Sequence, residues 1–120
     1  LAILAWGSML HPALAAGEAL NATVVNMRFV KPIDEKLLRE IAATHPLIVT
    51  VEEASVQGSA GGAVTEFLAN AGLNNRVHTL GLPDTFIDQG DHAQMLANCG
   101  LDKDGIIDSV NSTLSNGSLL

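Results

Sequence analysis

The sequence is poor in the residues that build covalent cross-links and metal centres. Its 120 residues include one cysteine, Cys99, which excludes an internal disulfide and any metal site that needs several cysteines. The histidines are few and far apart, and none belongs to a zinc-binding motif such as H-E-x-x-H. They are His11, His45, His78 and His92. We therefore expect no metal in this chain, and the lone cysteine fits a reducing, cytoplasmic compartment.

Basic residues are scarce as well. The chain has 6 Lys and Arg against 13 Asp and Glu, which gives a formal net charge of −7. Because the six cations are spread along the chain, no basic patch neutralises phosphates, and neither nucleic acid nor an anionic membrane surface is expected as a partner. No apolar run reaches the roughly 20 residues that a membrane-spanning helix needs. Residues 1–5 are apolar but too short for a signal peptide.

The size and the hydrophobic content suit one domain with its own core. The chain has 120 residues, of which 48% are hydrophobic. It starts with Leu1, inside a strand-like apolar pattern, and we interpret it as a piece of a longer protein. The predicted domain covers residues 1–114. Asn116 and Gly117 are breaker residues, and they predict a flexible tail over 115–120.

Short apolar segments alternate with segments of helical character. The predicted strands are residues 1–6, 23–27, 47–51 and 76–80, and the predicted helices are residues 12–20, 34–44, 61–71, 91–99 and 105–114. The strand segments are largely apolar instead of alternating, as expected for parallel strands that are covered on both faces. The order predicts an α/β fold: a three-layer α/β/α domain with a mainly parallel sheet.

Capping residues mark the ends of two predicted helices. Asp34 is placed to cap the N-terminus of the helix over 34–44. His45 and Pro46 end it, because proline disfavours helix in the residue before it. A partial positive charge on His45 also suits the C-terminal end of the helix dipole. Gly72 is a typical stop for the helix over 61–71.

A glycine-rich turn joins the third predicted strand to a helix over residues 51–62. In open α/β sheets ligands gather at this edge, and helix N-terminal amides favour an anion. The turn lacks the lysine of a phosphate-binding loop. Two interpretations stay open. The small residues let the helix pack closely on the sheet, or the turn and Arg28 hold a small anionic effector, which would make the chain a regulatory module.

Two adjacent carboxylates, Glu52 and Glu53, begin this turn. Neighbouring residues of a strand point to opposite faces, so the pair is not expected to act on one substrate as general acid and base. We expect one of the two to bind a backbone amide or a partner domain. Arg28 either pairs with an acidic neighbour such as Glu52 or binds a substrate phosphate.

Other polar candidates are isolated. His11 follows the first predicted strand and is expected in a loop at the sheet edge where sites form. Phe86 lies on a loop, and a loop aromatic is typical of an interface anchor. No nucleophile elbow surrounds the loop serines, and Cys99 is interpreted as a small buried apolar residue. The interface or effector candidates are His11, Arg28, Glu52, Glu53, Gly58, Gly61, Gly62 and Phe86.

Four segments that follow Gly7 also carry a family resemblance. Their order and spacing closely resemble the C-terminal region of the 1-deoxy-D-xylulose-5-phosphate synthase family, across nearly the whole chain. The first segment is Asn-Met-Arg-Phe-Val-Lys-Pro at 26–32, and the second is Val-Thr-Val-Glu-Glu at 49–53. The third is Leu-Gly-Leu-Pro-Asp at 80–84, which is followed by Phe-Ile at 86–87 and by Gly90. The fourth is Gly-Leu-Asp at 100–102, which is followed by Gly-Ile at 105–106. Ala54 stands where the family commonly has Asn, and Gly58-Ser59 where it often has Gly-Gly, which weakens a ligand role for that turn.

The resemblance implies a specific activity for the whole enzyme. Such enzymes are thiamine-diphosphate-dependent transferases of the transketolase type, with Mg²⁺, that condense pyruvate with glyceraldehyde 3-phosphate to 1-deoxy-D-xylulose 5-phosphate and CO₂. The product feeds isoprenoid, thiamine and pyridoxal biosynthesis. The cofactor lies between the two preceding domains of a homodimer, so the resemblance places no catalytic, cofactor-binding or metal residue in this chain. It implies a structural and interface domain that is inactive alone.

The resemblance also implies a transketolase C-terminal-like sheet that includes one antiparallel edge strand before the parallel ones. Because this chain begins at the first parallel strand, we expect the edge strand to be missing from it. A further alternative is the equivalent domain of a transketolase or of a 2-oxoacid dehydrogenase β subunit. The Leu-Gly-Leu-Pro-Asp segment disfavours that alternative.

Overall fold

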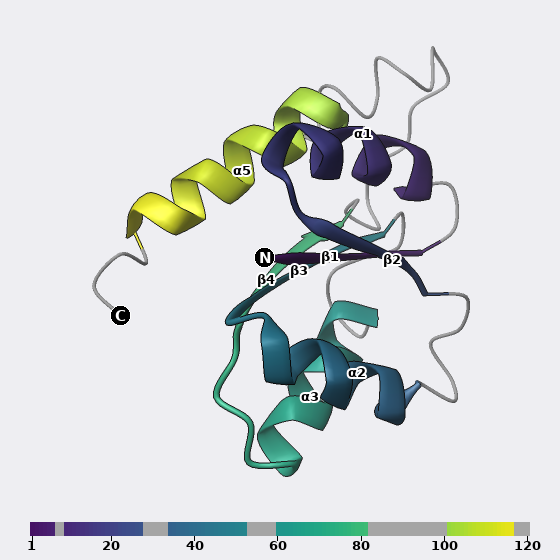
Figure 1. Ribbon diagram of the computed structural model, residues 1–120, viewed down its shortest axis with the longest axis vertical. Helices are drawn as coiled ribbons and strands as arrows, with labels where there is room; N and C mark the ends of the chain where they lie inside the picture. Colours follow the sequence, from purple (N-terminus) through teal and green to yellow (C-terminus); the bar gives the residue numbers. More distant parts are fainter. Residues whose placement is uncertain (7–8, 28–33, 53–59, 82–100, 117–120) are drawn as a thin grey trace.

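Strands and helices alternate along the chain in the computed structural model, which describes residues 1–6, 9–27, 34–52, 60–81 and 101–116 (Figure 1). The strands are β1 (Ala2–Ala5), β2 (Thr23–Asn26), β3 (Leu47–Glu52) and β4 (Arg76–Gly81). The helices are α1 (Leu10–Leu20), α2 (Glu35–Thr44), α3 (Ala60–Asn70) and α5 (Lys103–Asn116). The predicted helix over 91–99 lies outside the described residues.

The four described strands form one parallel sheet in the order β2-β1-β3-β4. Helices α1 and α5 cover one face, and α2 and α3 cover the other (Figure 1). The predicted three-layer α/β/α architecture is therefore confirmed. The antiparallel edge strand that the resemblance implies stays a prediction.

Two apolar clusters fill the spaces between the layers. Alternate residues of β1 and β3 point to opposite faces, so each central strand feeds both clusters. The cluster under α1 and α5 includes Ile3, Val49, Val51, Ile106 and Val110. The cluster between the sheet and helices α2 and α3 includes Leu4, Leu38, Ile48, Val64 and Leu68. Burial of both faces explains why these strands are apolar without alternation, whereas the edge strands β2 and β4 are partly exposed.

Local capping sets the helix ends. The backbone N–H of Leu37 donates to Asp34 Oδ1 at 3.0 Å, which confirms the predicted N-terminal cap of α2. Gly72 has a left-handed φ of +73°, and the N–H of Leu73 donates to the carbonyl of Leu68 at 2.9 Å. This is the hydrogen bond of a Schellman motif, so the predicted stop at Gly72 is confirmed.

Helix α1 starts earlier than the sequence predicts. It begins at Leu10, so the prediction that His11 lies in a loop is wrong: His11 is an exposed residue of the first helical turn. Pro12 lies in the first turn of α1, two residues after its start. The first N–H groups of a helix have no intrahelical partner, so a proline anywhere in this turn removes no bond.

Helix α5 extends beyond the predicted range at both ends. Asp102 Oδ1 accepts a hydrogen bond from the N–H of Gly105 at 2.8 Å, so Asp102 caps the helix and Lys103 starts it. At the other end Ser115 and Asn116 are helical, although the tail was expected to begin at Ser115. Residues 117–120 lie outside the described part.

None of the described helices is long and apolar enough to cross a membrane.

Candidate functional site

The described part of the chain contains four of the eight candidate residues. Glu52, Gly61 and Gly62 lie at the carboxyl end of β3 and the start of α3, whereas His11 lies apart from them on α1. The other four candidates, Arg28, Glu53, Gly58 and Phe86, lie outside the described residues. The structure therefore brings together one acidic side chain and two glycines.

Glu52 caps helix α3. Its side chain is 5% exposed, and its carboxylate accepts hydrogen bonds from two backbone N–H groups, Ala60 to Oε2 at 3.0 Å and Gly61 to Oε1 at 3.4 Å. A carboxylate at this position neutralises the positive end of the helix dipole and satisfies N–H groups that the helix itself leaves free. The prediction that one carboxylate of the pair binds a backbone amide is confirmed for Glu52.

This cap changes the interpretation of the glycine-rich turn. The N-terminal amides of α3 that an external anion would use are already held by Glu52. A second anion there would be repelled by the buried carboxylate. The described residues therefore favour close packing over an effector site at the start of α3.

Gly61 allows that close packing. A Cβ atom on Gly61 would lie 2.6 Å from Thr79 Cγ2 and 2.7 Å from Thr50 Oγ1, distances at which a neighbour must move. The helix thus rests directly on β3 and β4, as expected from the small residues of this segment. Gly62 differs, because a Cβ there would meet nothing within 4 Å. Only the first of the two glycines is required by packing.

Thr50 carries an orphaned polar atom in this region. Its side chain is fully buried on β3, and within the described residues its hydroxyl oxygen has no hydrogen-bond partner. Leaving a buried hydroxyl unpaired costs free energy, because water no longer satisfies it. The hydroxyl faces Gly61, so it lies beneath the start of α3.

Replacing Thr50 by valine is expected to raise the free energy of unfolding by about 1 kcal/mol, because it removes an unpaired buried hydroxyl at nearly constant volume. Urea unfolding of the purified chain measures this change. The control is Thr65→Val, since Thr65 Oγ1 donates to the carbonyl of Gly61 at 2.9 Å and is exposed. A loss of stability in Thr50→Val would show that the hydroxyl has a partner.

His45 joins two elements at the other end of the sheet. Its Nδ1 lies 3.0 Å from the carbonyl oxygen of Ile41 and 2.9 Å from Thr44 Oγ1. Its Nε2 lies 2.9 Å from Thr23 Oγ1 at the start of β2. His45 therefore caps the C-terminus of α2, as predicted, and its contacts are those of a structural residue.

The acidic and metal-binding side chains of the described residues are dispersed. No three His, Cys, Asp or Glu side chains among them come close enough together to hold a metal ion. Glu52, the one buried carboxylate there, is engaged with the amides of α3. We therefore derive no catalytic step through Mg²⁺ or thiamine diphosphate in this chain.

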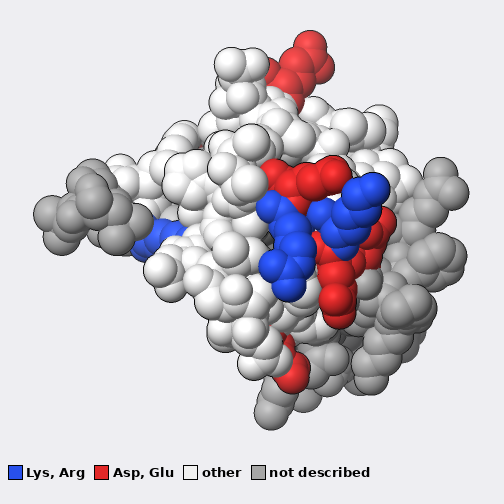
Figure 2. Space-filling view, turned by 60° about the horizontal axis from the view of Figure 1, so that its bottom comes forward, with Lys and Arg blue, Asp and Glu red and all other residues white. Residues whose placement is uncertain are grey.

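The surface formed by α2 and α3 has mixed charge. Figure 2 shows basic and acidic side chains interleaved on this face, without a patch of one sign. The guanidinium carbon of Arg39 lies 5.2 Å from the ring centroid of Phe67, a cation–π contact that joins the two helices. The arrangement is that of a solvated face.

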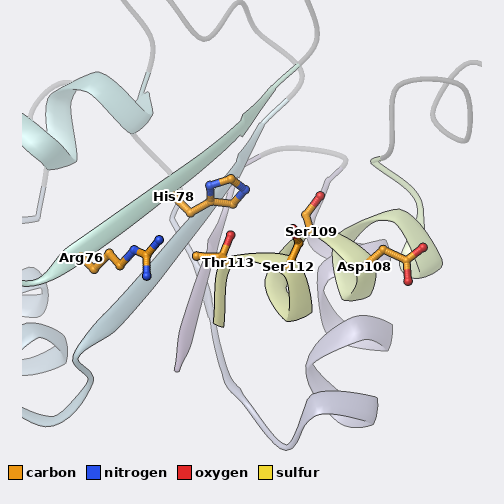
Figure 3. A pocket seen from close by; sticks show the side chains of 6 residues that line it. All are labelled: Arg76, His78, Asp108, Ser109, Ser112 and Thr113. Atoms are coloured by element: carbon orange, nitrogen blue, oxygen red, sulfur yellow. The ribbon is translucent and has the colours of Figure 1, made fainter. Parts of the chain in front are cut away.

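A polar groove between β4 and α5 was not predicted from the sequence. Arg76 and His78 project from β4 toward Ser109, Ser112 and Thr113 of α5 (Figure 3). Burial, and then the nearby charge of Arg76, lower the pKa of His78 below its ordinary value. The sequence spacing could have indicated that each set of side chains shares a face. Arg76 and His78 are two residues apart on a strand, and Ser109, Ser112 and Thr113 are three or four residues apart on a helix.

Comparisons with known proteins agree with this architecture. The transketolase C-terminal domain family matches residues 1–106. A solved structure described as a split-gene transketolase, an inactive β4 tetramer, superimposes with a TM-score of 0.85 and 34% identity, covering 95% of this chain and 39% of that one.

Close relatives share one name. A 1-deoxy-D-xylulose-5-phosphate synthase from Nitrosomonas eutropha is 61% identical over 115 residues, which is 96% of this chain and 19% of that protein. One from Nitrosospira multiformis is 58% identical over 110 residues, 92% of this chain and 18% of that protein. This chain thus spans about a fifth of the length of these relatives. On the match to residues 1–106 and the shared fold, the chain belongs to the transketolase C-terminal domain family.

Proposed function

We propose that this chain is the C-terminal domain of a 1-deoxy-D-xylulose-5-phosphate synthase and contributes packing and assembly to that enzyme. The observation that carries the proposal is the 61% identity over 115 residues to a synthase of that name. The ordered motifs at 26–32, 49–53 and 80–84 support the same assignment.

The side-chain chemistry supports a structural role for the domain. Glu52 and His45, two polar residues with resolved contacts, bind the backbone of their own fold. Catalytic groups normally converge on a reacting atom, and these two lie at opposite ends of β3. In the proposed enzyme the domain holds neighbouring parts of the protein in place, and the reacting groups come from elsewhere in the longer chain.

The whole enzyme is proposed to be a thiamine-diphosphate- and Mg²⁺-dependent transferase that acts on pyruvate and glyceraldehyde 3-phosphate. Its product would feed isoprenoid, thiamine and pyridoxal biosynthesis. We further propose a homodimer in the cytoplasm, with the two cofactor-binding domains as partners of this one. The single cysteine of the chain supports a reducing compartment.

The alternatives are less well supported. An effector site on the glycine-rich turn is disfavoured by the Glu52 cap, which holds the amides of α3. The equivalent domain of a transketolase is disfavoured by lower identity, 34% for the split-gene transketolase against 61% for the synthase. The higher identity therefore favours the synthase over the transketolase.

A domain exchange tests the proposal. The corresponding region of the Nitrosomonas eutropha synthase is replaced by residues 1–120 of this chain, and CO₂ release from pyruvate with glyceraldehyde 3-phosphate is measured. We expect the chimera to retain activity, because the two domains are 61% identical over 115 residues. The chain alone is expected to release no CO₂ and to bind no thiamine diphosphate with Mg²⁺ in calorimetry.

Two controls make the result specific. The synthase truncated before this domain is expected to be inactive or unable to assemble. The synthase carrying the C-terminal domain of a transketolase is expected to be much less active than the chimera. Equal activity of both exchanges would argue against a synthase-specific domain, and tight cofactor binding by the isolated chain would contradict the structural role.

A further inference from the structure

An open groove of about 460 Å³ lies between the edge strand β4 and helix α5, on the face of the sheet opposite to α2 and α3 (Figure 3). Its lining residues are Arg76, His78, Asp108, Ser109, Ser112 and Thr113. We propose that this groove binds a small phosphate monoester, with Arg76, His78 and the α5 hydroxyls as its ligands. The site is distinct from the start of α3, and it stands independently of the proposed synthase function.

Two nitrogen-bearing side chains provide the recognition. Arg76 and His78 are two residues apart on β4, so both point to the α5 face of the sheet (Figure 3). Both are half-buried. In the part of the chain that the structure describes, no acidic side chain forms an ion pair with Arg76, so its guanidinium is free to bind an external oxyanion. Arginine suits phosphate especially, because its planar donors engage two oxygens at once.

Hydroxyl groups complete the wall on the helix side. Ser109, Ser112 and Thr113 fall at i, i+3 and i+4, which places them on one face of α5. Figure 3 shows this face turned toward His78 and Arg76. Each hydroxyl is able to donate one hydrogen bond to a phosphate oxygen. Asp108 also lines the groove, but its carboxylate is directed away from the two β4 side chains in the same view.

The size of the groove favours a phosphate attached to a small organic group. A volume of about 460 Å³ falls in the lower part of the range of roughly 300–1,000 Å³ that is typical of small-molecule sites. An inorganic ion would occupy a small part of it. A monoester places its phosphate between the cations and leaves the remaining space for the alcohol portion.

The groove also predicts a dependence on pH. Burial and the charge of Arg76 lower the pKa of His78, so this imidazole is neutral at neutral pH. Its charged neighbours in the groove are Arg76 on β4 and Asp108 on α5, while Val49, opposite it on β3, is uncharged. A dianionic phosphate beside His78 favours the imidazolium, so binding takes up a proton and strengthens as the pH falls toward about 6, where the phosphate itself becomes protonated.

Heteronuclear NMR of the full 120-residue chain tests the site. Methyl phosphate, inorganic phosphate and chloride are titrated separately at constant ionic strength. We expect saturable shifts confined to β4 and α5 with both phosphates, tighter binding of methyl phosphate, and no saturation with chloride. Arg76→Gln is expected to weaken binding at least about tenfold, because a charge-assisted hydrogen bond pair is lost. His78→Asn is expected to remove the proton uptake on binding and to leave only the pH dependence that comes from the second ionisation of the phosphate, at about pH 6.

Lys36→Gln is the matched control, since it removes one positive charge from the exposed surface of α2, on the other face of the sheet. It is expected to leave the affinity unchanged. Unchanged shifts for residues outside β4 and α5 confirm that the Arg76 and His78 variants are folded. The proposal is overturned if phosphate causes no saturable shift at β4 and α5, or if Arg76→Gln binds it as tightly as the unaltered chain.

Discussion

Gly61→Ala is expected to lower the free energy of unfolding by about 2–3 kcal/mol, the range of a core that is overpacked. The added Cβ would lie 2.6 Å from Thr79 Cγ2 and 2.7 Å from Thr50 Oγ1. Thr50 is fully buried on the central strand β3 and has little room to move. Helix α3 must therefore shift away from the sheet, and urea unfolding followed by circular dichroism measures the loss.

The neighbouring glycine is the control for this effect. Gly62 is in the same turn of α3, but a Cβ there would meet nothing within 4 Å. Gly62→Ala is therefore expected to stabilise the chain by up to about 1 kcal/mol through helix propensity. Opposite signs at adjacent positions would identify packing as the cause. Similar stabilities for the two variants would contradict direct contact between α3 and the sheet.

The second large effect is expected at Glu52. Glu52→Ala removes the buried carboxylate that accepts hydrogen bonds from the backbone N–H groups of Ala60 and Gly61. These two amides then lack that partner. Hydrogen bonds to an ionised group contribute about 1.5–3 kcal/mol each, and we expect a total loss of about 3 kcal/mol. Urea unfolding gives the loss, and hydrogen exchange should be faster at the amides of residues 60 and 61.

Glu52→Gln separates the charge from the hydrogen bonds. The amide side chain keeps the size of the glutamate and one acceptor oxygen but lacks the charge that opposes the helix dipole. We expect its stability to lie between those of the unaltered chain and Glu52→Ala. An alanine variant as stable as the unaltered chain would contradict the capping role, and it would reopen the start of α3 as an anion site.

Much of the fold follows from local patterns. The mainly apolar run at 47–51 predicts β3 closely, because a strand covered on both faces needs apolar residues at nearly every position. The segment at 76–80 also predicts β4, although Arg76 and His78 make it only partly apolar, as suits an edge strand that is partly exposed. The cap at Asp34 and the stop at Gly72 are equally local, since each depends on one side chain or one backbone angle. The start of α1 at Leu10 is less predictable, because a proline in the first helical turn does not fix which residue begins the helix.

The functional interpretation needed the tertiary structure. From the sequence, Glu52 was one of two adjacent carboxylates with several open roles, and the distances to Ala60 and Gly61 decide among them. The difference between Gly61 and Gly62 is likewise invisible in the sequence, because it depends on how α3 meets Thr50 and Thr79. Each of these features depends on atoms that are distant along the chain.

The sequence by itself determined the α/β alternation, the resemblance to the synthase family and the scarcity of cysteines and cations, since these depend on residue order and composition. The tertiary structure alone decided which glycine is required, what the buried glutamate binds and that Arg76 and His78 face the hydroxyls of α5. The physical reason is that helix and strand periodicity is local, whereas contact between β4 and α5 arises only when segments more than 20 residues apart pack on one sheet.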